Sequence, residues 1–366
     1  MNSNPWIKLT MAAMLVLSAT SVMAAGGSDD EDVGAVYTMS NASSGNQILV
    51  FNRDGNGALT AAGAVSTQGA GSGGGLDALG SQHSLVLTED DRWLVAANAG
   101  SNEISVLRVV SHGLEFAYKT GSGGTFPVSA AVFHDLVYVL NGGATPNITG
   151  FYLGHDGHLT PIANSTRTLS ASAYAEVGFD TRGEALVVTD KGNSRILTYA
   201  VDHRGLPAAN PVISASSGVT PFGLSFDDRD HLLVVAATSD AVSSYKLEAN
   251  GTLQTISAMI GNGQKAACWI ATDGRHHIFT ANPGTASIST YNLNARNGVI
   301  TLQSGVASTG TAPLDITLTR DGQFLYALDP GSLSIDTFRV AHDGTLTKLA
   351  PVAGGFSTYA QGIAVR

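Results

Sequence analysis

Short runs of mostly apolar residues recur along the chain, and each run ends on a polar residue. Seven of these runs align with one another. Their last residues are Asn41, Asn98, Asn141, Asp190, Thr238, Asn282 and Asp329. The intervals between them run from 43 residues, between Asn98 and Asn141, to 57 residues, between Asn41 and Asn98. The chain is therefore built from a structural repeat, and each run reads as a strand that is buried on both faces.

Each of the seven runs is followed by a second β-like run and then by a glycine turn. The second runs end on Phe51, Leu107, Tyr152, Tyr199, Tyr245, Tyr291 and Phe338. Glycine suits these turns because it adopts positive φ without steric cost. Another short strand precedes each repeat, as at residues 223–226, so each repeat supplies four strands. The pattern predicts an all-β, seven-bladed propeller of four-stranded antiparallel blades.

The two ends of the repeat array are each incomplete. Residues 359–366 resemble the first strand of a repeat that has no second strand, and the repeat that begins at Gly34 lacks a first strand. We expect the C-terminal strand to complete the N-terminal blade, which leaves no sheet edge open. A solenoid that does not close is the structural alternative. Residues 34–366 are predicted to form a single domain.

The N-terminal segment has the pattern of an export signal. Residues 1–25 begin with a polar stretch that contains Lys8, continue with an apolar run, and end on small residues, so we predict cleavage near Ala24 or Ala25. A membrane anchor is the alternative. Residues 26–33 are predicted to be a flexible acidic leader, and no later stretch approaches the ~20 apolar residues that span a bilayer. The expected location is periplasmic or extracellular, without transmembrane anchoring.

Composition narrows the classes of partner. The formal net charge is −10 and the sequence pI is about 5.3, with no basic block, so nucleic acid is not an expected partner. The single cysteine, Cys268, cannot form an intramolecular disulfide or a cysteine-rich zinc site. We expect a monomer without a resident cofactor, which binds a small molecule, a glycan or a protein at the channel mouth.

The glycine-rich run at residues 69–75 lies in the longest gap between repeats. It lacks the Gly-Lys-Ser/Thr ending of a phosphate-binding loop and opens no helix. We interpret it as a flexible surface loop.

Strand geometry indicates where a site would form. In a four-stranded blade the first strand starts on the face of the disc where the second strand ends, so residues at these places surround one mouth of the channel. The predicted catalytic residues are Glu176, His83 and Asp315, and the predicted ligand-binding residues are Trp269, Asn98, Asn141, Asp190, Asn282 and Asp329. The alternative for the Asn and Asp residues is that they cap strand ends.

Four carboxyl groups belong to this predicted mouth, which makes it acidic. They are those of Glu176, Asp190, Asp315 and Asp329. Because like charges disfavour joint ionisation, we expect at least one raised carboxyl pKa or a bound cation at the mouth. Trp269 is expected to offer a ring face for stacking.

The repeats carry a family resemblance. The Asp-Gly turns, the sequence Asn-Ala-Gly-Ser-Asn at residues 98–102 and Thr-Pro-Phe-Gly at residues 220–223 resemble the lactonase-like seven-bladed propellers. That family includes propeller-type 6-phosphogluconolactonases and 3-carboxymuconate-lactonizing enzymes. The resemblance covers residues 34–366 and is nearest to secreted members of the 3-carboxymuconate cyclase-like kind. It implies a lactone as substrate.

The residues that the resemblance would make catalytic are largely replaced. The family's Pro-Arg-His step corresponds to residues 221–223, its Glu to Ala237 or Thr238, its His-containing step to residues 175–177, and its Arg to Pro283. The Asp-x-Gly pattern persists at residues 190–192. We therefore expect a secreted binding propeller. The alternative is a lactone hydrolase or cycloisomerase that acts on a non-phosphorylated sugar acid or muconate-type lactone.

Overall fold

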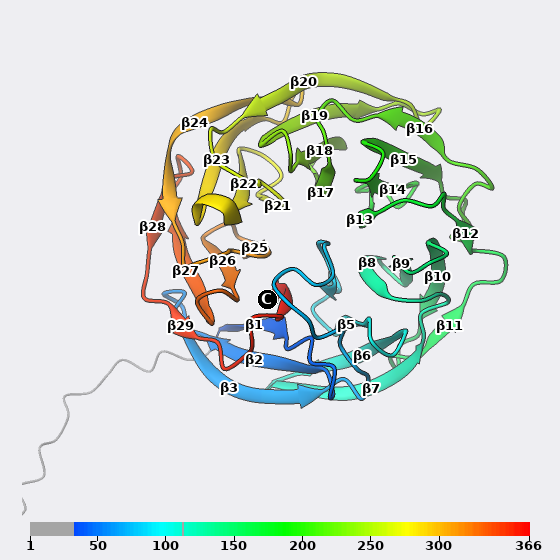
Figure 1. Cartoon of the computed structure of the whole chain (residues 1–366), viewed down its shortest axis with the longest axis horizontal. Coiled ribbons are helices and arrows are strands. Elements are labelled where there is room, and N and C mark those ends of the chain that lie inside the picture. The colour runs from blue at the N-terminus through cyan, green and yellow to red at the C-terminus, as the bar shows by residue number, and fades with distance from the viewer. Residues whose placement is uncertain (1–32, 112) are drawn as a thin grey trace, which may run out of the picture. The chain divides into compact units, whose positions relative to one another are not determined.

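Seven antiparallel sheets surround a central channel in the computed structural model, which describes residues 33–111 and 113–366 (Figure 1). The all-β seven-bladed propeller is therefore confirmed. The predicted signal peptide at residues 1–25 lies outside the described residues, as does the acidic leader except for Val33. Across the described part of the chain, no helix is long and apolar enough to cross a membrane.

We number the blades 1 to 7 in chain order and give their strands from the channel outward. Blade 1 holds β30 (Gln361–Val365), β1 (Gly34–Met39), β2 (Gln47–Arg53) and β3 (Leu59–Ser66). Blade 2 holds β4 (Leu85–Leu87), β5 (Trp93–Asn98), β6 (Glu103–Val110) and β7 (Gly113–Gly121). Blade 3 holds β8 (Pro127–Phe133), β9 (Leu136–Asn141) and β10 (Asn147–Leu153), with β11 (Leu159–Pro161) and β12 (Arg167–Thr168) both paired to β10.

The remaining blades follow the same plan. Blade 4 holds β13 (Tyr174–Phe179), β14 (Ala185–Asp190), β15 (Arg195–Ala200) and β16 (Val212–Ala215). Blade 5 holds β17 (Pro221–Phe226), β18 (His231–Ala236), β19 (Ala241–Leu247) and β20 (Leu253–Gly261). Blade 6 holds β21 (Trp269–Thr272), β22 (His277–Asn282), the short 3-10 helix η1 (Pro283–Thr285), β23 (Ser287–Asn294) and β24 (Val299–Ser308). Blade 7 holds β25 (Ile316–Leu318), β26 (Phe324–Asp329) and β27 (Ser334–Val340), with β28 (Leu346–Lys348) and β29 (Val352–Ala353) both paired to β27.

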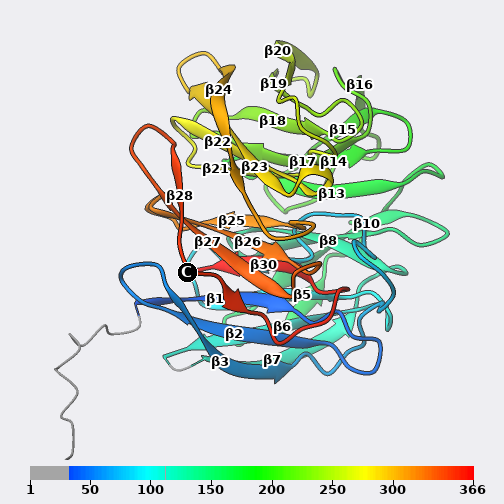
Figure 2. The ribbon, with the colours of Figure 1, turned by 60° about the vertical axis from the view of Figure 1, so that its left-hand side comes forward.

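The ring closes through the C-terminal strand. β30 pairs antiparallel with β1, with Val36 opposite Val365, and the two strands lie side by side in Figure 2. The Thr38 hydroxyl adds a bond of 2.7 Å to the Gly362 carbonyl oxygen. This confirms the predicted closure and rules out the open solenoid.

Buried second strands and large aromatic residues form the core between blades. Every residue of β5, β14, β22 and β26 is buried, as expected where one blade packs between two others. Most of the predicted aromatic positions are fully buried. Blade 3 differs, because Phe151 occupies the core and the next residue, Tyr152, is 37% exposed. The exposed Tyr152 ring becomes part of a groove described below.

The two faces of the disc carry different connections. One face carries the ends of the second strands and the long link between β3 and β4, and we call it the sealed face. The opposite face carries the turns between first and second strands, such as Glu89–Arg92 and His134–Asp135, and we call it the open face.

Candidate functional site

The glycine-rich link between blades 1 and 2 packs against the sealed face. The Gly71 and Gly73 N–H groups donate to the carbonyl oxygens of Ala42 and Asn41 at 2.9 and 2.8 Å. Both glycines are buried. The prediction of a surface loop is wrong for these residues, because backbone N–H groups that a glycine run leaves uncovered bond to the strand ends beneath them.

Residues 77–83, which continue this link, cross the channel, and we call them the plug (Figure 1). The Gln82 side chain bonds the backbone of Ile270 in blade 6 twice, donating to its oxygen at 2.7 Å and accepting from its nitrogen at 3.0 Å. The Ser81 hydroxyl donates to the Val128 carbonyl in blade 3 at 2.7 Å. One segment of chain thus connects blades on opposite sides of the channel.

The plug also covers Trp269, which the sequence placed at an accessible mouth. Trp269 is 1% exposed, and its indole N–H donates to the Ser81 carbonyl at 2.9 Å. Its ring packs edge-on against Phe222 with centroids 5.2 Å apart. The expectation of a stacking platform is wrong for this structure, because both the ring and its polar atom already have partners.

The Asn residues at the ends of the second strands are wholly buried. Asn98 accepts bonds from the Thr67 hydroxyl at 2.7 Å and from the Asn46 amide at 3.1 Å. Asn141 donates to the Ser122 carbonyl at 3.1 Å, and Asn282 accepts from the Asn262 amide at 2.8 Å. These contacts match the alternative in which the Asn residues cap strand ends.

The four predicted carboxyl groups do not form one acidic mouth. Asp190 pairs with Arg195 at 2.7 Å in blade 4. Asp329 lies in blade 7, where burial and the neighbouring Asp336 carboxylate raise its pKa to about 9. Raised carboxyl pKa values are present as expected, but burial is their largest cause. In the described residues no group of three or more His, Cys, Asp or Glu side chains is arranged to hold a metal ion.

The channel does bring His83, Glu176 and Asp315 together. His83 ends the plug with a positive φ of 58°, and its carbonyl oxygen accepts from the Ala130 N–H at 2.8 Å. This backbone anchor aims its ring at β13, where Nδ1 bonds Oε1 of Glu176. The other oxygen of Glu176 accepts from the Leu224 N–H at 2.6 Å, so the carboxyl group is held at both atoms.

Burial and charge act in opposite directions on the His83 pKa. Burial lowers it, but the charge and hydrogen bond of Glu176, together with the charge of Asp315, outweigh burial and raise it from 6.5 to about 9. Burial raises the pKa of Glu176, with His83 opposing the change. The His83 side chain is 43% exposed and Glu176 is fully buried, so the proton of the pair rests on the imidazole that water can solvate.

Asp315 is the third member of this group. It is buried at the start of blade 7, and its Oδ1 accepts from the Ile316 N–H at 3.0 Å. Burial raises its pKa to about 8, with the His83 charge lowering and the Glu176 charge raising it. Burial thus raises the pKa of both carboxyl groups while the His83 charge opposes the change, so the protonation of the three groups is coupled.

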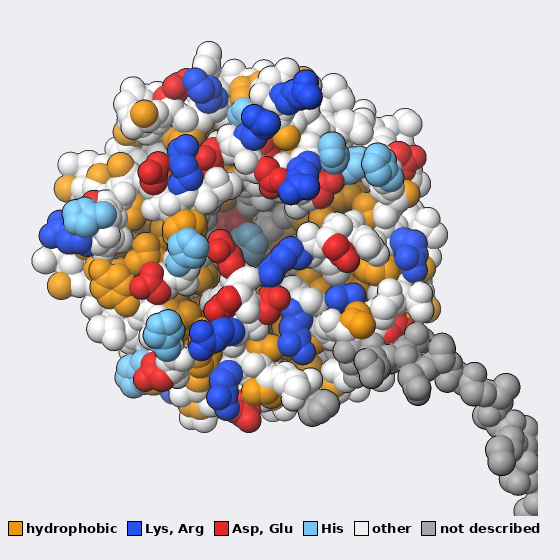
Figure 3. All heavy atoms as spheres, turned by 180° about the vertical axis from the view of Figure 1, so that it is seen from behind, with side chains coloured by type: hydrophobic (Ala, Val, Ile, Leu, Met, Phe, Trp, Pro, Cys, Tyr) orange, Lys and Arg blue, Asp and Glu red, His pale blue; other side chains and the backbone are white. Residues whose placement is uncertain are grey.

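His83 and Glu176 line a cavity of about 240 Å³ in the channel. Its other walls come from the inner strands β8, β13 and β17 and from Glu89 and Asp180 of the open face. Figure 3 shows a hollow at the centre of the disc, ringed by acidic and basic side chains. No Lys or Arg is among the residues that line this cavity.

Sequence reasoning missed Gln82, which fixes the position of His83, and Glu89, which lines the cavity. The available signal was the interval of 57 residues between Asn41 and Asn98, the longest between repeats. An insertion of that length after an outer strand has enough chain to reach the channel.

Comparisons with known proteins agree with this architecture. A family model described as "Lactonase, 7-bladed beta-propeller" matches residues 172–356. The comparison with curated proteins found no match.

Three solved structures are similar to the chain. A Bacteroides fragilis protein with a provisional assignment as 6-phosphogluconolactonase has a TM-score of 0.73 and 16% identity, covering 93% of this chain and 100% of that chain. A periplasmic gluconolactonase of Pseudomonas aeruginosa has a TM-score of 0.71 and 18% identity, covering 91% and 98%. A Lactobacillus plantarum protein has a TM-score of 0.74 and 18% identity, covering 91% and 99%. At these identities the similarity shows the fold.

The family match rests on sequence. It begins just before β13, which carries Glu176, and extends into blade 7, so it covers about half of the 366 residues. The repeats, the closed ring of blades and this match support the same assignment. The chain belongs to the lactonase family of seven-bladed β-propellers.

Proposed function

We propose that the channel cavity hydrolyses a small, non-phosphorylated lactone with His83 as the general base. The observation that carries this proposal is the bond between His83 Nδ1 and the fully buried Glu176 carboxyl, at the wall of the cavity. A histidine oriented by a carboxylate is a recurrent general base in hydrolysis. Membership of the lactonase family supports the choice of substrate class.

Glu176 and His83 have different roles in the proposed hydrolysis. Because Glu176 occupies Nδ1, Nε2 is the nitrogen of His83 that remains for a water molecule. Neutral His83 takes a proton from this water as its oxygen attacks the lactone carbonyl carbon. The tetrahedral intermediate then breaks the ring C–O bond, and His83 returns the proton to the departing oxygen. The product is the open-chain hydroxy acid, which contains every atom of lactone and water.

The cavity favours a small neutral substrate. Its volume of about 240 Å³ lies below the roughly 300–1,000 Å³ of sites for drug-sized ligands. Glu89 and Asp180 line it, while Lys and Arg do not. A phosphate group would therefore meet two carboxylates, with the His83 imidazole as the one basic side chain among the lining residues, which argues against a phosphosugar lactone.

The test is hydrolysis of glucono-1,5-lactone by the purified protein, with the spontaneous reaction subtracted at each pH. Since a base must be deprotonated, kcat/KM should rise with pH toward the His83 pKa of about 9. Glu176→Gln should lower kcat/KM at least ~100-fold. Glu115→Gln is the control, because this exposed glutamate lies on β7, the outer strand of blade 2, and does not line the cavity.

Two results would contradict hydrolysis. One is the absence of protein-dependent turnover with any simple aldonolactone. The other is turnover that a folded His83→Gln variant retains in full.

Noncatalytic binding is the second candidate, and the charge of His83 favours it. A pKa of about 9 makes the imidazole cationic at neutral pH, so the cavity suits the carboxylate of a sugar acid. The pH dependence separates the two functions. Calorimetric binding of gluconate should weaken as pH rises from 7 to 10, whereas base catalysis should strengthen.

The proposed site of action is outside the cytoplasm. The support is the sequence pattern of residues 1–25, which is that of a signal peptide. N-terminal sequencing of protein from its native host should find a start near Ala25 or Gly26. A mature chain that still carries Met1 would contradict export.

A further inference from the structure

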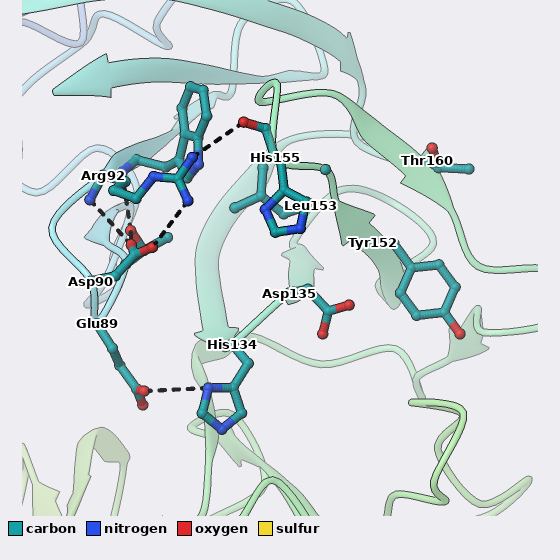
Figure 4. A pocket seen from close by; sticks show the side chains of 12 residues that line it. Glu89, Asp90, Arg92, His134, Asp135, Tyr152, Leu153, His155 and Thr160 are labelled. Carbon is teal, nitrogen blue, oxygen red and sulfur yellow. Dashed lines mark hydrogen bonds and ion pairs between the residues drawn. The ribbon is translucent and has the colours of Figure 1, made fainter.

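A second cavity opens on the same face as the channel, between blades 2 and 3. Its volume is about 760 Å³, roughly three times that of the channel cavity. Turns that follow the inner strands form one side, and the end of β10 forms the other. Figure 4 shows Asp135, His155 and Tyr152 around this space, which we call the interblade groove.

The interblade groove adjoins the channel cavity. Glu89 lines both cavities. In blade 3, Phe133 lines the channel cavity and the next two residues, His134 and Asp135, line the groove. A ligand that is longer than the channel cavity can therefore extend from His83 across Glu89 into the groove without leaving the protein surface.

The polar groups of the interblade groove suit hydroxyl groups. Arg92 pairs with Asp90 at 3.8 Å, and Glu89 lies 3.7 Å from His134. The exposed Asp135 carboxylate has no side-chain partner within the described residues, so it is available as an acceptor. The excess of carboxylates over Arg92 disfavours an anionic ligand.

Tyr152 gives the interblade groove a fixed aromatic side chain. Its hydroxyl donates to the Arg204 carbonyl at 2.6 Å, and its side chain is partly open to solvent. Aromatic rings that are held in place and flanked by hydrogen-bond acceptors are suited to the apolar face of a sugar ring. Charge, acceptors and the aromatic ring all favour a neutral, polyhydroxylated ligand.

We propose that the interblade groove binds a glycosyl unit attached to the lactone, so that the substrate is the lactone of an oxidised oligosaccharide. This inference rests on the proposed hydrolysis in the channel cavity. The lactone ring occupies the cavity at His83, and the glycosyl unit extends past Glu89 to Asp135 and Tyr152. A reaction that oxidises the reducing end of an oligosaccharide must supply such a substrate, and its product is the corresponding aldonic acid.

The experiment compares glucono-1,5-lactone with the disaccharide lactones lactobionolactone, maltobionolactone and cellobionolactone. At least one disaccharide lactone should have a kcat/KM about tenfold higher than the monosaccharide. Asp135→Asn and Tyr152→Ala should each remove most of this advantage and leave kcat/KM for glucono-1,5-lactone within twofold. Arg296→Ala is the matched control, because Arg296 lines a different groove, between blades 5 and 6, on the same face.

Calorimetry with the open-chain acids tests the interblade groove independently of hydrolysis. If no lactone is turned over, at least one of lactobionate, maltobionate and cellobionate should still bind more tightly than gluconate, and Asp135→Asn should abolish the difference. Equal kcat/KM values for the monosaccharide and disaccharide lactones, with equal affinities for the corresponding acids, would overturn the groove proposal. The channel proposal would remain intact. Tighter binding of an amine such as spermidine than of the disaccharide acids at the groove would also overturn the groove proposal.

Discussion

The two faces of the disc differ in how they treat the channel. On the sealed face, residues 77–83 cross the opening, and buried Asn residues bond the strand ends beneath. On the open face, the turns stand apart around a cavity of about 240 Å³ that reaches His83 and Glu176. The same repeated blade produces both faces.

The difference shows that one insertion decides which mouth of a symmetric ring can receive a ligand. Without the plug, Trp269 and the inner strand ends of the sealed face would surround an opening. With the plug in place, His83, the proposed general base, extends into the channel from the sealed face. A ligand reaches His83 from the open face. Gln82 on one side and Glu176 on the other hold the same histidine-bearing segment.

The largest expected stability effect comes from Trp269. Trp269→Ala should lower the free energy of unfolding by about 3–5 kcal/mol, because it empties a filled core position under the plug. Tyr152→Ala on the open face should cost about 1 kcal/mol or less, since its ring is partly solvated. Urea unfolding of both variants measures the contrast. Similar losses for the two would mean that the sealed face is not the packed one.

Gln82→Ala should have the next largest effect. It leaves the buried N–H and carbonyl of Ile270 without partners, at a cost of about 1–3 kcal/mol. It should also loosen His83 and lower kcat more than it raises KM. Glu89→Gln, the open-face counterpart, should change stability by less than about 0.5 kcal/mol. A Gln82→Ala protein with unchanged kcat would show that the plug does not position the base.

The third expected change is gradual rather than all-or-none: Asp315, as one titrating group, alters stability by at most about 1.4 kcal/mol for each step of one in pH. The pKa of Asp315 rises from 3.8 to about 8 on folding. Its stabilising contribution is therefore complete below pH 3.8 and is lost as pH rises to about 8.

Asp315→Asn should remove this dependence, so the variant gains stability relative to the parent between pH 5 and 8. The His83 contribution, with its raised pKa, is lost only as pH rises toward about 9. Melting temperatures of parent and variant at pH 5, 7 and 9 test the sign. A difference in melting temperature between parent and variant that stays constant from pH 5 to pH 9 would show that Asp315 does not titrate in this range.

Repetition made the fold accessible from sequence. Seven aligned apolar runs, glycine turns and the unpaired segment at residues 359–366 each depend on local pattern, and a repeated pattern leaves few arrangements that bury it. The same logic placed His83, Glu176 and Asp315 near the channel. It failed at Trp269 and at the buried Asn residues, because position on a face does not reveal what else covers that face.

The sequence by itself determined the blade, the number of blades and the closure of the ring, since these follow from strand periodicity and the need to bury apolar faces. Only the tertiary structure decided which mouth is open, because the glycine-rich link bonds to strand ends that are distant in sequence. It also decided the partner of His83 and the direction of its pKa, because these depend on two carboxyl groups that lie 93 and 232 residues away along the chain. Burial and close contact between distant segments determine the partner and the pKa of His83, and the local sequence pattern predicts neither burial nor these contacts.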